Sequence, residues 1–295
     1  MFSLLNVLGL SIGVASVIFA ILYWNNEHAY DQWNPEKENV YQVLNVIGGT
    51  GDTWATSSIP FGQTCKATIP EIEQICFMND WYNEAVVKYQ NKKLIDKKIT
   101  VSDNNFFDFY PFPIIKGAKK DILKEKNSVA ISEEQAKLLF KDEDPIGKSI
   151  IYGDKPYIVK SVYRIVRPSS VEPNYVFGGI IRENDINSWG NFSYGLKIKI
   201  KKGTDINVVL KKMHHVNYVN RTLKDAKESG QTVEQYIKEN GELKIVLDQL
   251  KTSRLHGTKT SGSNSPEGRG NLQLIYIMAG LSILILVLSL VNYIN

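Results

Sequence analysis

The distribution of charge along this chain limits its fold more than any other feature. No Asp, Glu, Lys or Arg lies between Met1 and Asn26, and none lies between Gly270 and Asn295. All 35 basic and all 31 acidic residues therefore fall between Glu27 and Arg269. A soluble domain does not leave both of its ends apolar and free of charge, so this pattern predicts a membrane protein.

Both uncharged ends are long enough to cross a bilayer. Phe2–Tyr23 and Leu272–Ile294 have about 22 and 23 residues, so each helix would reach roughly 33 Å across a hydrocarbon core of about 30 Å. We therefore expect transmembrane helices over residues 1–24 and 272–295. The first stretch lacks a basic leading region and a small-residue cleavage motif, which argues against a signal peptide. Because both spans stop at the chain ends, there are no flanking loops whose Lys and Arg content would predict the orientation of the spans in the membrane. From this layout we expect the chain to be part of a longer polypeptide.

One face of the first span carries small residues. Gly9, Gly13, Ser16 and Ala20 are spaced i, i+4, i+7 and i+11, which places them on one side of a helix. In lipid, small residues allow a second helix to approach closely. Glycine is also simply common in membrane helices, but we favour a helix-packing face.

The first charged residues predict a helical stalk over residues 25–34. This segment contains no Gly or Pro and ends before Pro35, and the residue before a proline avoids the helical region. Glu27 and Asp31, with His28 between them, are expected to form a solvated face, opposite an aromatic side with Tyr23 and Tyr30. A helix that stops soon after the membrane surface is the alternative.

The sequence between the spans predicts an α+β domain over residues 35–250, divided into two subdomains. The chain is 43% apolar and 22% charged, which excludes disordered and fibrous classes. Strands and helices interleave, which favours an α+β fold over a sandwich. Residues 251–271 are rich in Gly, Ser, Thr and Lys, which is typical of a flexible loop.

Local patterns place several elements in this domain. Two hairpins are expected, one from Ser149–Tyr152 and Pro156–Ile165 and one from Glu84–Tyr89 and Leu94–Val101. Ser132 and Asp205 are expected to begin helices. Leu196–Lys201 alternates strictly between apolar residues and lysine, which indicates a strand with one solvated face.

The sequence contains no recognisable catalytic group. It has no Gly-rich phosphate loop ending in Gly-Lys-Ser/Thr, and no serine lies in a Gly-x-Ser-x-Gly turn, so ATP binding by that route is excluded. The four histidines lack metal-ligand spacing, and we expect no cofactor. A net charge of +4 is too small for a nucleic-acid platform. Cys65 and Cys76 could pair in an oxidising compartment, or could remain small buried apolar residues.

Seven short segments in a fixed order carry a family resemblance. They are Asn6–Gly13, Tyr30–Trp33, Asn39–Val43, Ile69–Ile72, Ser102–Phe107 followed by Gly117, Val129–Ser132 followed by Ala136, Phe140 and Pro145–Lys148, and Asn271 with Asn292–Asn295. In this order they resemble MacB/FtsX-like ABC transporter permeases over essentially the whole chain. Gln42 stands where that family usually has Arg. Arg164 and Arg167–Ser170 replace an acidic residue and a Pro-x-Asn-Ser turn, so we expect the local turn to differ from that of the family.

The resemblance implies a non-catalytic permease subunit of the bacterial inner membrane, with residues 25–271 periplasmic as a MacB-type core domain. It implies three kinds of partner: a separate cytosolic ABC ATPase, a second permease copy or half that forms a dimer with this one, and in some members a periplasmic adaptor. Family substrates range from peptides and macrolide antibiotics to lipoproteins, and some members regulate cell-wall hydrolases. The alternative is the extracytoplasmic region of a two-span sensor, which the sequence downstream of the second span would reveal.

Overall fold

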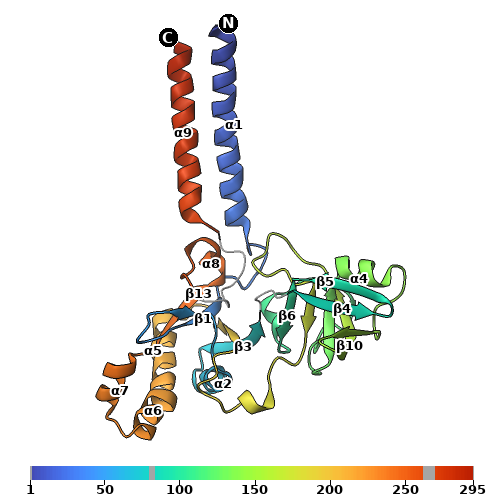
Figure 1. Ribbon diagram of the computed structural model, residues 1–295, viewed down its shortest axis with the longest axis vertical. Helices are drawn as coiled ribbons and strands as arrows, with labels where there is room; N and C mark the ends of the chain where they lie inside the picture. The colour runs from blue at the N-terminus through green and yellow to red at the C-terminus, as the bar shows by residue number, and fades with distance from the viewer. Residues whose placement is uncertain (1, 80–83, 262–269, 295) are drawn as a thin grey trace.

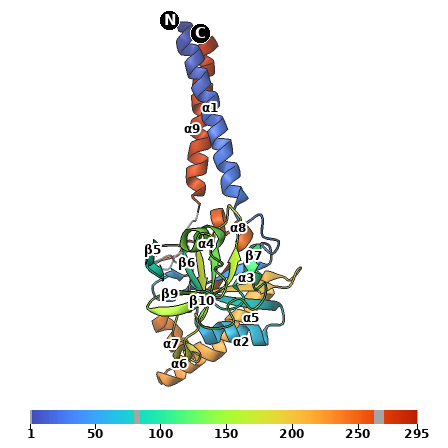
Figure 2. The ribbon, with the colours of Figure 1, turned by 90° about the vertical axis from the view of Figure 1, so that its right-hand side faces the viewer.

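Two long helices project from one end of a mixed α/β domain (Figure 1). The computed structural model describes residues 2–79, 84–261 and 270–294. Helix α1 spans Phe2–Ala29 and helix α9 spans Leu272–Ile294. Both are long and apolar enough to cross a membrane, and both expose most of their surface. Figures 1 and 2 show them side by side, with both chain ends at the far end from the domain. The domain therefore lies between two helices that fit a membrane protein.

Thirteen strands in the described part of the chain form one mixed sheet. Its order is β13-β1-β12-β3-β6-β11-β8-β10-β9-β4-β5, while β2 pairs with β1 and β7 with β10. The strands are β1 Val40–Val46, β2 Thr53–Trp54, β3 Ile72–Asn79, β4 Ala85–Tyr89, β5 Lys92–Asp96, β6 Ile99–Ser102, β7 Ile114–Gly117, β8 Ser128–Ser132, β9 Ser149–Tyr152, β10 Lys155–Tyr163, β11 Tyr175–Phe177, β12 Gly195–Ile200 and β13 Lys244–Gln249. The sheet is continuous, so the two predicted subdomains share it.

The β13-β1-β12-β3 end of the sheet packs against helices on one face. Helices α2 (Ile59–Thr68) and α5 (Ile206–Asn217) cover this face, and Val43, Phe77 and Met213 are fully or almost fully buried between them. A π turn (Tyr218–Thr222), α6 (Leu223–Glu228) and α7 (Val233–Asn240) continue from α5. Figure 1 places α2, α6 and α7 on the side of the domain away from α1 and α9.

The other end of the sheet and its middle have separate cores. Helix α4 (Glu133–Phe140) packs its Leu139 and Phe140 against the outer strands. The middle is an aromatic cluster around the short helix α3 (Phe106–Phe109), in which Phe112 and Tyr163 stack at 5.7 Å between ring centroids. The chain also has a 3₁₀ turn at Glu183–Asp185.

Several predicted elements are confirmed. β9 and β10 form the expected hairpin, and its two-residue turn has Gly153 at φ 54° and Asp154 at φ 59°, as a type I′ turn requires. Ser132 and Asp205 cap α4 and α5 by accepting hydrogen bonds from backbone amides two or three residues later. The mixed α+β class is confirmed as well.

The second predicted hairpin is shorter than expected. β4 pairs with β5, but the predicted strand Leu94–Val101 is interrupted after Asp96. The Asp96 carboxylate accepts a hydrogen bond of 2.7 Å from the Lys98 amide, which stabilises a turn. The rest of the predicted strand becomes β6, which pairs with β3 and β11 in the middle of the sheet.

The prediction of a flexible loop over residues 251–271 is wrong for its first part. Helix α8 occupies Leu250–His256, and Thr258 then donates to the buried Asp248 carboxylate. The Ser261 amide donates to Thr53 O at 2.7 Å, which ties this segment to β2. Composition does not indicate these contacts, because they depend on where β13 and β2 lie in the folded domain. Residues 262–269 lie outside the described part of the chain.

The predicted solvated face of the strand over 196–201 is also wrong. β12 lies inside the sheet, and Lys197 is only 6% exposed. Its Nζ donates to Gln42 Oε1 at 2.7 Å and lies 5.8 Å from the Tyr110 ring centroid. The sheet is covered on both faces here, because the aromatic cluster packs where alternation alone suggested water. A buried cation thus lies beside Gln42, where the resembled family usually has Arg.

Candidate functional site

The first long helix ends in a turn that is packed into the domain. α1 stops at Ala29, so the predicted helical stalk over residues 25–34 is shorter than expected. Asp31 has φ 59°, a left-handed conformation that cannot continue the helix. The Asp31 amide donates to Pro168 O at 3.1 Å. The helix therefore ends where its chain meets the domain, before Pro35 has any influence.

The predicted solvated face of the stalk is buried. Glu27 is 4% exposed and Asp31 is fully buried, whereas His28 between them is exposed. Their spacing is as expected, but the domain covers that side of the helix end. The i, i+4 pattern therefore marks a docking face of α1 rather than a solvated one.

Glu27 forms a buried, two-bond ion pair with Arg254 of α8. Arg254 Nε and Nη2 donate to the two Glu27 oxygens at 2.8 and 2.9 Å, a geometry that fixes both orientation and distance. The Arg254 side chain is only 13% exposed and the Glu27 side chain only 4%. The two residues lie 227 positions apart in the sequence. This pair joins α1 to the segment that leads into α9.

Two further residues complete this contact. The Arg254 guanidinium carbon lies 3.8 Å from the Tyr30 ring centroid, within cation–π range. The Gly270 amide donates to Arg254 O at 2.8 Å, and a Cβ on Gly270 would lie 2.4 Å from the Glu27 carboxylate. Glycine is therefore required for this approach. We call Glu27, Tyr30, Arg254 and Gly270 the junction.

A second contact joins the end of α1 to the segment between β10 and β11. Asp31 Oδ1 accepts from the Ser169 hydroxyl at 3.1 Å and from the Ser170 amide at 3.0 Å. Burial raises the pKa of the Asp31 carboxyl, and these hydrogen bonds oppose the shift. Asn34 adds a further contact between this segment and the domain, since its side-chain Nδ2 donates to Phe109 O of the aromatic cluster at 2.8 Å.

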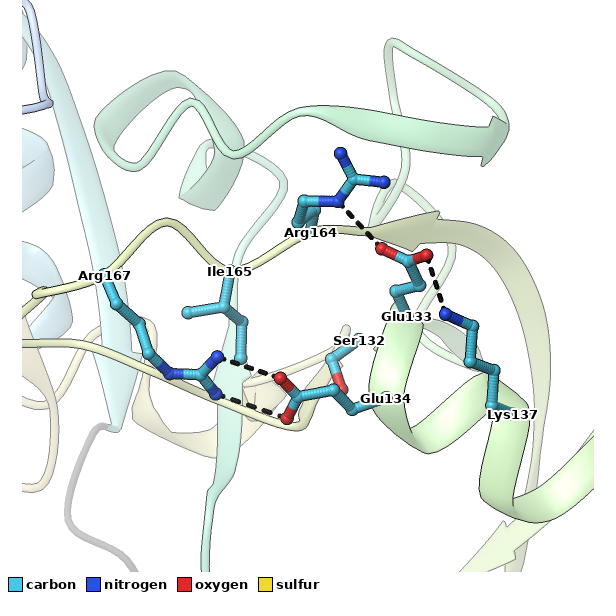
Figure 3. Close-up of a pocket in the computed structure, with 7 residues that line it drawn as sticks. All are labelled: Ser132, Glu133, Glu134, Lys137, Arg164, Ile165 and Arg167. Atoms are coloured by element: carbon cyan, nitrogen blue, oxygen red, sulfur yellow. Dashed lines mark hydrogen bonds and ion pairs between the residues drawn. The ribbon is translucent and has the colours of Figure 1, made fainter.

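The segment that receives Asp31 is also tied to α4. Arg167 donates to both Glu134 oxygens, at 2.8 and 3.2 Å, and Arg164 donates to Glu133 at 2.8 Å (Figure 3). The hydrogen bonds from Arg164 and then Lys137 lower the pKa of Glu133 to about 2. These groups line a hollow of about 320 Å³. The departure from the family pattern at residues 164–170 thus links α1 to the outer end of the sheet.

The small-residue face of α1 lies against α9. Ser289 Oγ donates to Gly9 O at 2.9 Å, and Ser282 Oγ donates to Ser16 O at 3.0 Å. A Cβ on Gly13 would lie 3.1 Å from Leu286 Cα. Ala20 lines a hollow between the two helices. The structure therefore brings all four predicted residues to the side of α1 that faces α9, and serine hydroxyls bridge the backbones.

The main residues of the candidate site that sequence reasoning missed are Arg254, Gly270 and the Ser169–Ser170 pair. Arg254 and Gly270 both fall in the segment expected to be a loop, residues 251–271, and composition gives no sign of their partners. The only signal for Ser169–Ser170 is the departure from the family pattern at the turn. No group of three or more metal-ligating side chains occurs within residues 2–79, 84–261 and 270–294. The buried Cys65 and Cys76 are free thiols.

Comparison with a model of a known protein family identifies the family of this chain. The model of the MacB-like periplasmic core domain matches residues 3–216. The chain belongs to the MacB-like periplasmic core domain family. It is thus a MacB/FtsX-like permease chain, as the order of its motifs predicted. The family match favours this identity over the sensor alternative.

Two solved structures share the fold of this chain. A domain assigned to a permease protein of Porphyromonas gingivalis is 16% identical, with a TM-score of 0.60, over 73% of this chain and 91% of that one. The periplasmic region of MacB from Actinobacillus actinomycetemcomitans is 15% identical, with a TM-score of 0.52, over 79% of this chain and 98% of that one. No curated protein sequence matches the chain significantly. At such identities these likenesses establish the fold alone.

Proposed function

We propose that this MacB-like chain is a non-catalytic permease subunit that transmits movement between its membrane helices and its periplasmic domain. A separate cytosolic ABC ATPase would supply the movement, and a second permease copy or half would complete the transporter. The observation that carries this proposal is the junction, where α1 and the chain that leads into α9 meet at the buried Glu27–Arg254 pair. A displacement of either helix would reach the domain through this pair.

The proposed path divides at the end of α1. One branch runs through Glu27 to Arg254 and α8, and then to β13, the strand that directly precedes α8 in the chain. The other runs through Asp31 to the Ser169–Ser170 segment and from Arg167 to α4. Both ends of the sheet are therefore held to the same helix. The buried contacts of Glu27 and Asp31 with the domain suit rigid-body movement, because buried polar contacts resist separation. The Arg167–Glu134 pair is exposed and adds little to this attachment.

The substrate class follows from the family and stays a proposal. Export or extrusion of a peptide, an antibiotic or a lipoprotein-like molecule fits the chain, and so does regulation of a cell-wall hydrolase through a periplasmic adaptor. The proposed location is the bacterial inner membrane, with the domain in the periplasm.

The first test of this function is partner capture. We expect the full-length permease, solubilised in mild detergent from its own cells, to copurify with an ABC ATPase and to acquire ATP turnover from it. Turnover should disappear when the Walker lysine of the partner is substituted, because this chain has no phosphate-binding loop. Copurification with a histidine kinase instead, or ATP turnover by the permease alone, would overturn the proposal.

The second test is topology. Lys119 and Lys227 are exposed on different parts of the domain, and we expect cysteines at these positions to react with an impermeant thiol reagent added to cells with a permeabilised outer membrane. The unchanged chain is the control, because its Cys65 and Cys76 are buried. Burial also raises the pKa of both native thiols, which reduces their reactivity further. Protection of both introduced cysteines until the inner membrane is lysed would place the domain in the cytosol.

A further inference from the structure

Two hollows lie next to each other where the long helices meet the domain. The interhelical hollow, of about 210 Å³, lies between α1 and α9 and has an almost wholly apolar lining that includes Val17, Ile21, Trp24, Ile275, Ala279 and Ile283. The junction hollow, of about 180 Å³, lies beside the last turn of α1 and is lined mostly by polar and charged residues, which include His28, Tyr30, Lys251, Thr252, Arg254 and His256.

The two hollows share one face of α1. Val17, Ile21, Trp24 and His28 are spaced i, i+4, i+7 and i+11, so they form one stripe along the helix. Trp24 and His28 stack at 4.3 Å between ring centroids, and His28 Nδ1 lies 2.9 Å from Trp24 O. Trp24 also lies 6.4 Å from Tyr276 of α9. Aromatic residues of this kind mark the level of lipid headgroups, so the apolar hollow lies on the bilayer side and the polar hollow outside it.

Two of the residues that line the junction hollow, Lys251 and Arg254, are cations. Glu27 is its acidic lining residue, and both Glu27 oxygens are already bound by Arg254. Lys251 is 43% exposed and pairs with the exposed Glu38, a surface ion pair that contributes little and exchanges readily. Lys251 and His256 are both exposed at opposite ends of α8. Both line the junction hollow, so a phosphate bound there would compete with Glu38 for Lys251 and would leave the buried Glu27–Arg254 pair in place.

We propose that the two hollows together bind one anionic phospholipid of the outer leaflet. Part of one acyl chain would lie in the interhelical hollow, and the phosphate would accept hydrogen bonds from Lys251 and His256 in the junction hollow. The cations of the junction hollow suit the phosphate, and the apolar lining of the interhelical hollow suits the acyl chain. The two hollows lie about one helical turn apart along α1, as the two parts of one lipid require. The inference rests on the proposed topology, in which α1 and α9 cross the membrane and the domain is periplasmic, and it does not depend on coupling to an ATPase.

The test measures lipid that stays bound after purification. The full-length permease is reconstituted in phosphatidylcholine nanodiscs with a small fraction of phosphatidylglycerol, then released into detergent and weighed by native mass spectrometry. We expect about one retained phosphatidylglycerol per chain. The Lys251→Gln/His256→Gln variant should retain it roughly tenfold less well, since charge-assisted hydrogen bonds are lost. Ala279→Leu, which fills the apolar hollow, should weaken retention to a similar extent.

Lys259→Gln is the matched control, because Lys259 is an exposed lysine three residues beyond His256. It should retain the lipid as the unchanged chain does. Equal losses in the control and the double variant would mean general attraction to anionic membranes and would overturn the proposal. Displacement of the lipid by inorganic phosphate, with no effect of Ala279→Leu, would indicate a site for free phosphate and overturn it too. Failure of the unchanged chain to retain lipid would do the same and leave the proposed transport function intact.

Discussion

Replacing Arg254 by Ala is expected to open the junction and to abolish transport while ATP turnover continues. Glu27 would then be left as a buried carboxylate with no cation beside it, and removing one partner of a buried ion pair costs about 3–5 kcal/mol. Hydrogen exchange of the α8 amides should therefore accelerate roughly a hundredfold or more. α8 is short, and its attachment to α1 depends on this pair. The measurement is hydrogen–deuterium exchange on the purified full-length permease.

The control for this prediction is Arg164→Ala. Arg164 also pairs with a glutamate, but its side chain is 59% exposed, so solvent can replace the lost contact and exchange in α8 should not change. A double variant, Glu27→Gln with Arg254→Gln, should be closer to the unchanged chain than the two single variants predict, because it leaves no unpaired buried charge. If Arg254→Ala behaves like Arg164→Ala, the junction does not hold the helices to the domain.

The features that could be predicted from the sequence depend on local residue patterns or on the distribution of charge along the chain. The charge-free ends predict both long helices, since no soluble fold requires such stretches. Gly153-Asp154 predicts a tight hairpin because both residues tolerate positive φ, and the structure has both there. The i, i+4 spacing of Val209 and Met213 is likewise typical of an apolar helix face, and both residues are buried in α5.

What the sequence could not predict depends on partners far away in the chain. Glu27 is typical of a solvated helix face until Arg254 is placed beside it. Lys197 is typical of a solvated strand face until the aromatic cluster covers that side of the sheet. In both cases a polar residue is buried with a partner that no local pattern indicates. The candidate site consists of such residues, so it was less predictable than the fold.

The end of α1 illustrates the same limit. Pro35 correctly predicts that no helix continues through it, but the helix ends at Ala29. The cause is Asp31, whose left-handed backbone is stabilised by contacts with Pro168, Ser169 and Ser170. Because of these tertiary contacts, the helix ends about one turn earlier than Pro35 alone would require. The helix propensities of the local residues do not indicate this earlier end.

A pair of glycines in the last turns of α1 is expected to separate ATP turnover from movement of the domain. Asn25 and Asn26 are exposed and precede Glu27, so replacing both by Gly leaves the side chains of the junction in place. Each glycine weakens a helix interior by about 1 kcal/mol, and a pair provides a point of bending. Substitution of Glu27 and His28 would be a poorer test, because it would also remove the buried ion pair.

Transmission through α1 is tested most directly by one distance measurement. The full-length permease with its ATPase carries a spin label at Lys227→Cys, and the distance between labels on two permease copies is recorded with and without ATP. The unchanged chain and the Asn25→Ala/Asn26→Ala control should show an ATP-dependent shift in this distance. The Asn25→Gly/Asn26→Gly variant should hydrolyse ATP at the same rate and show no shift. A full shift in the glycine variant would contradict transmission through α1.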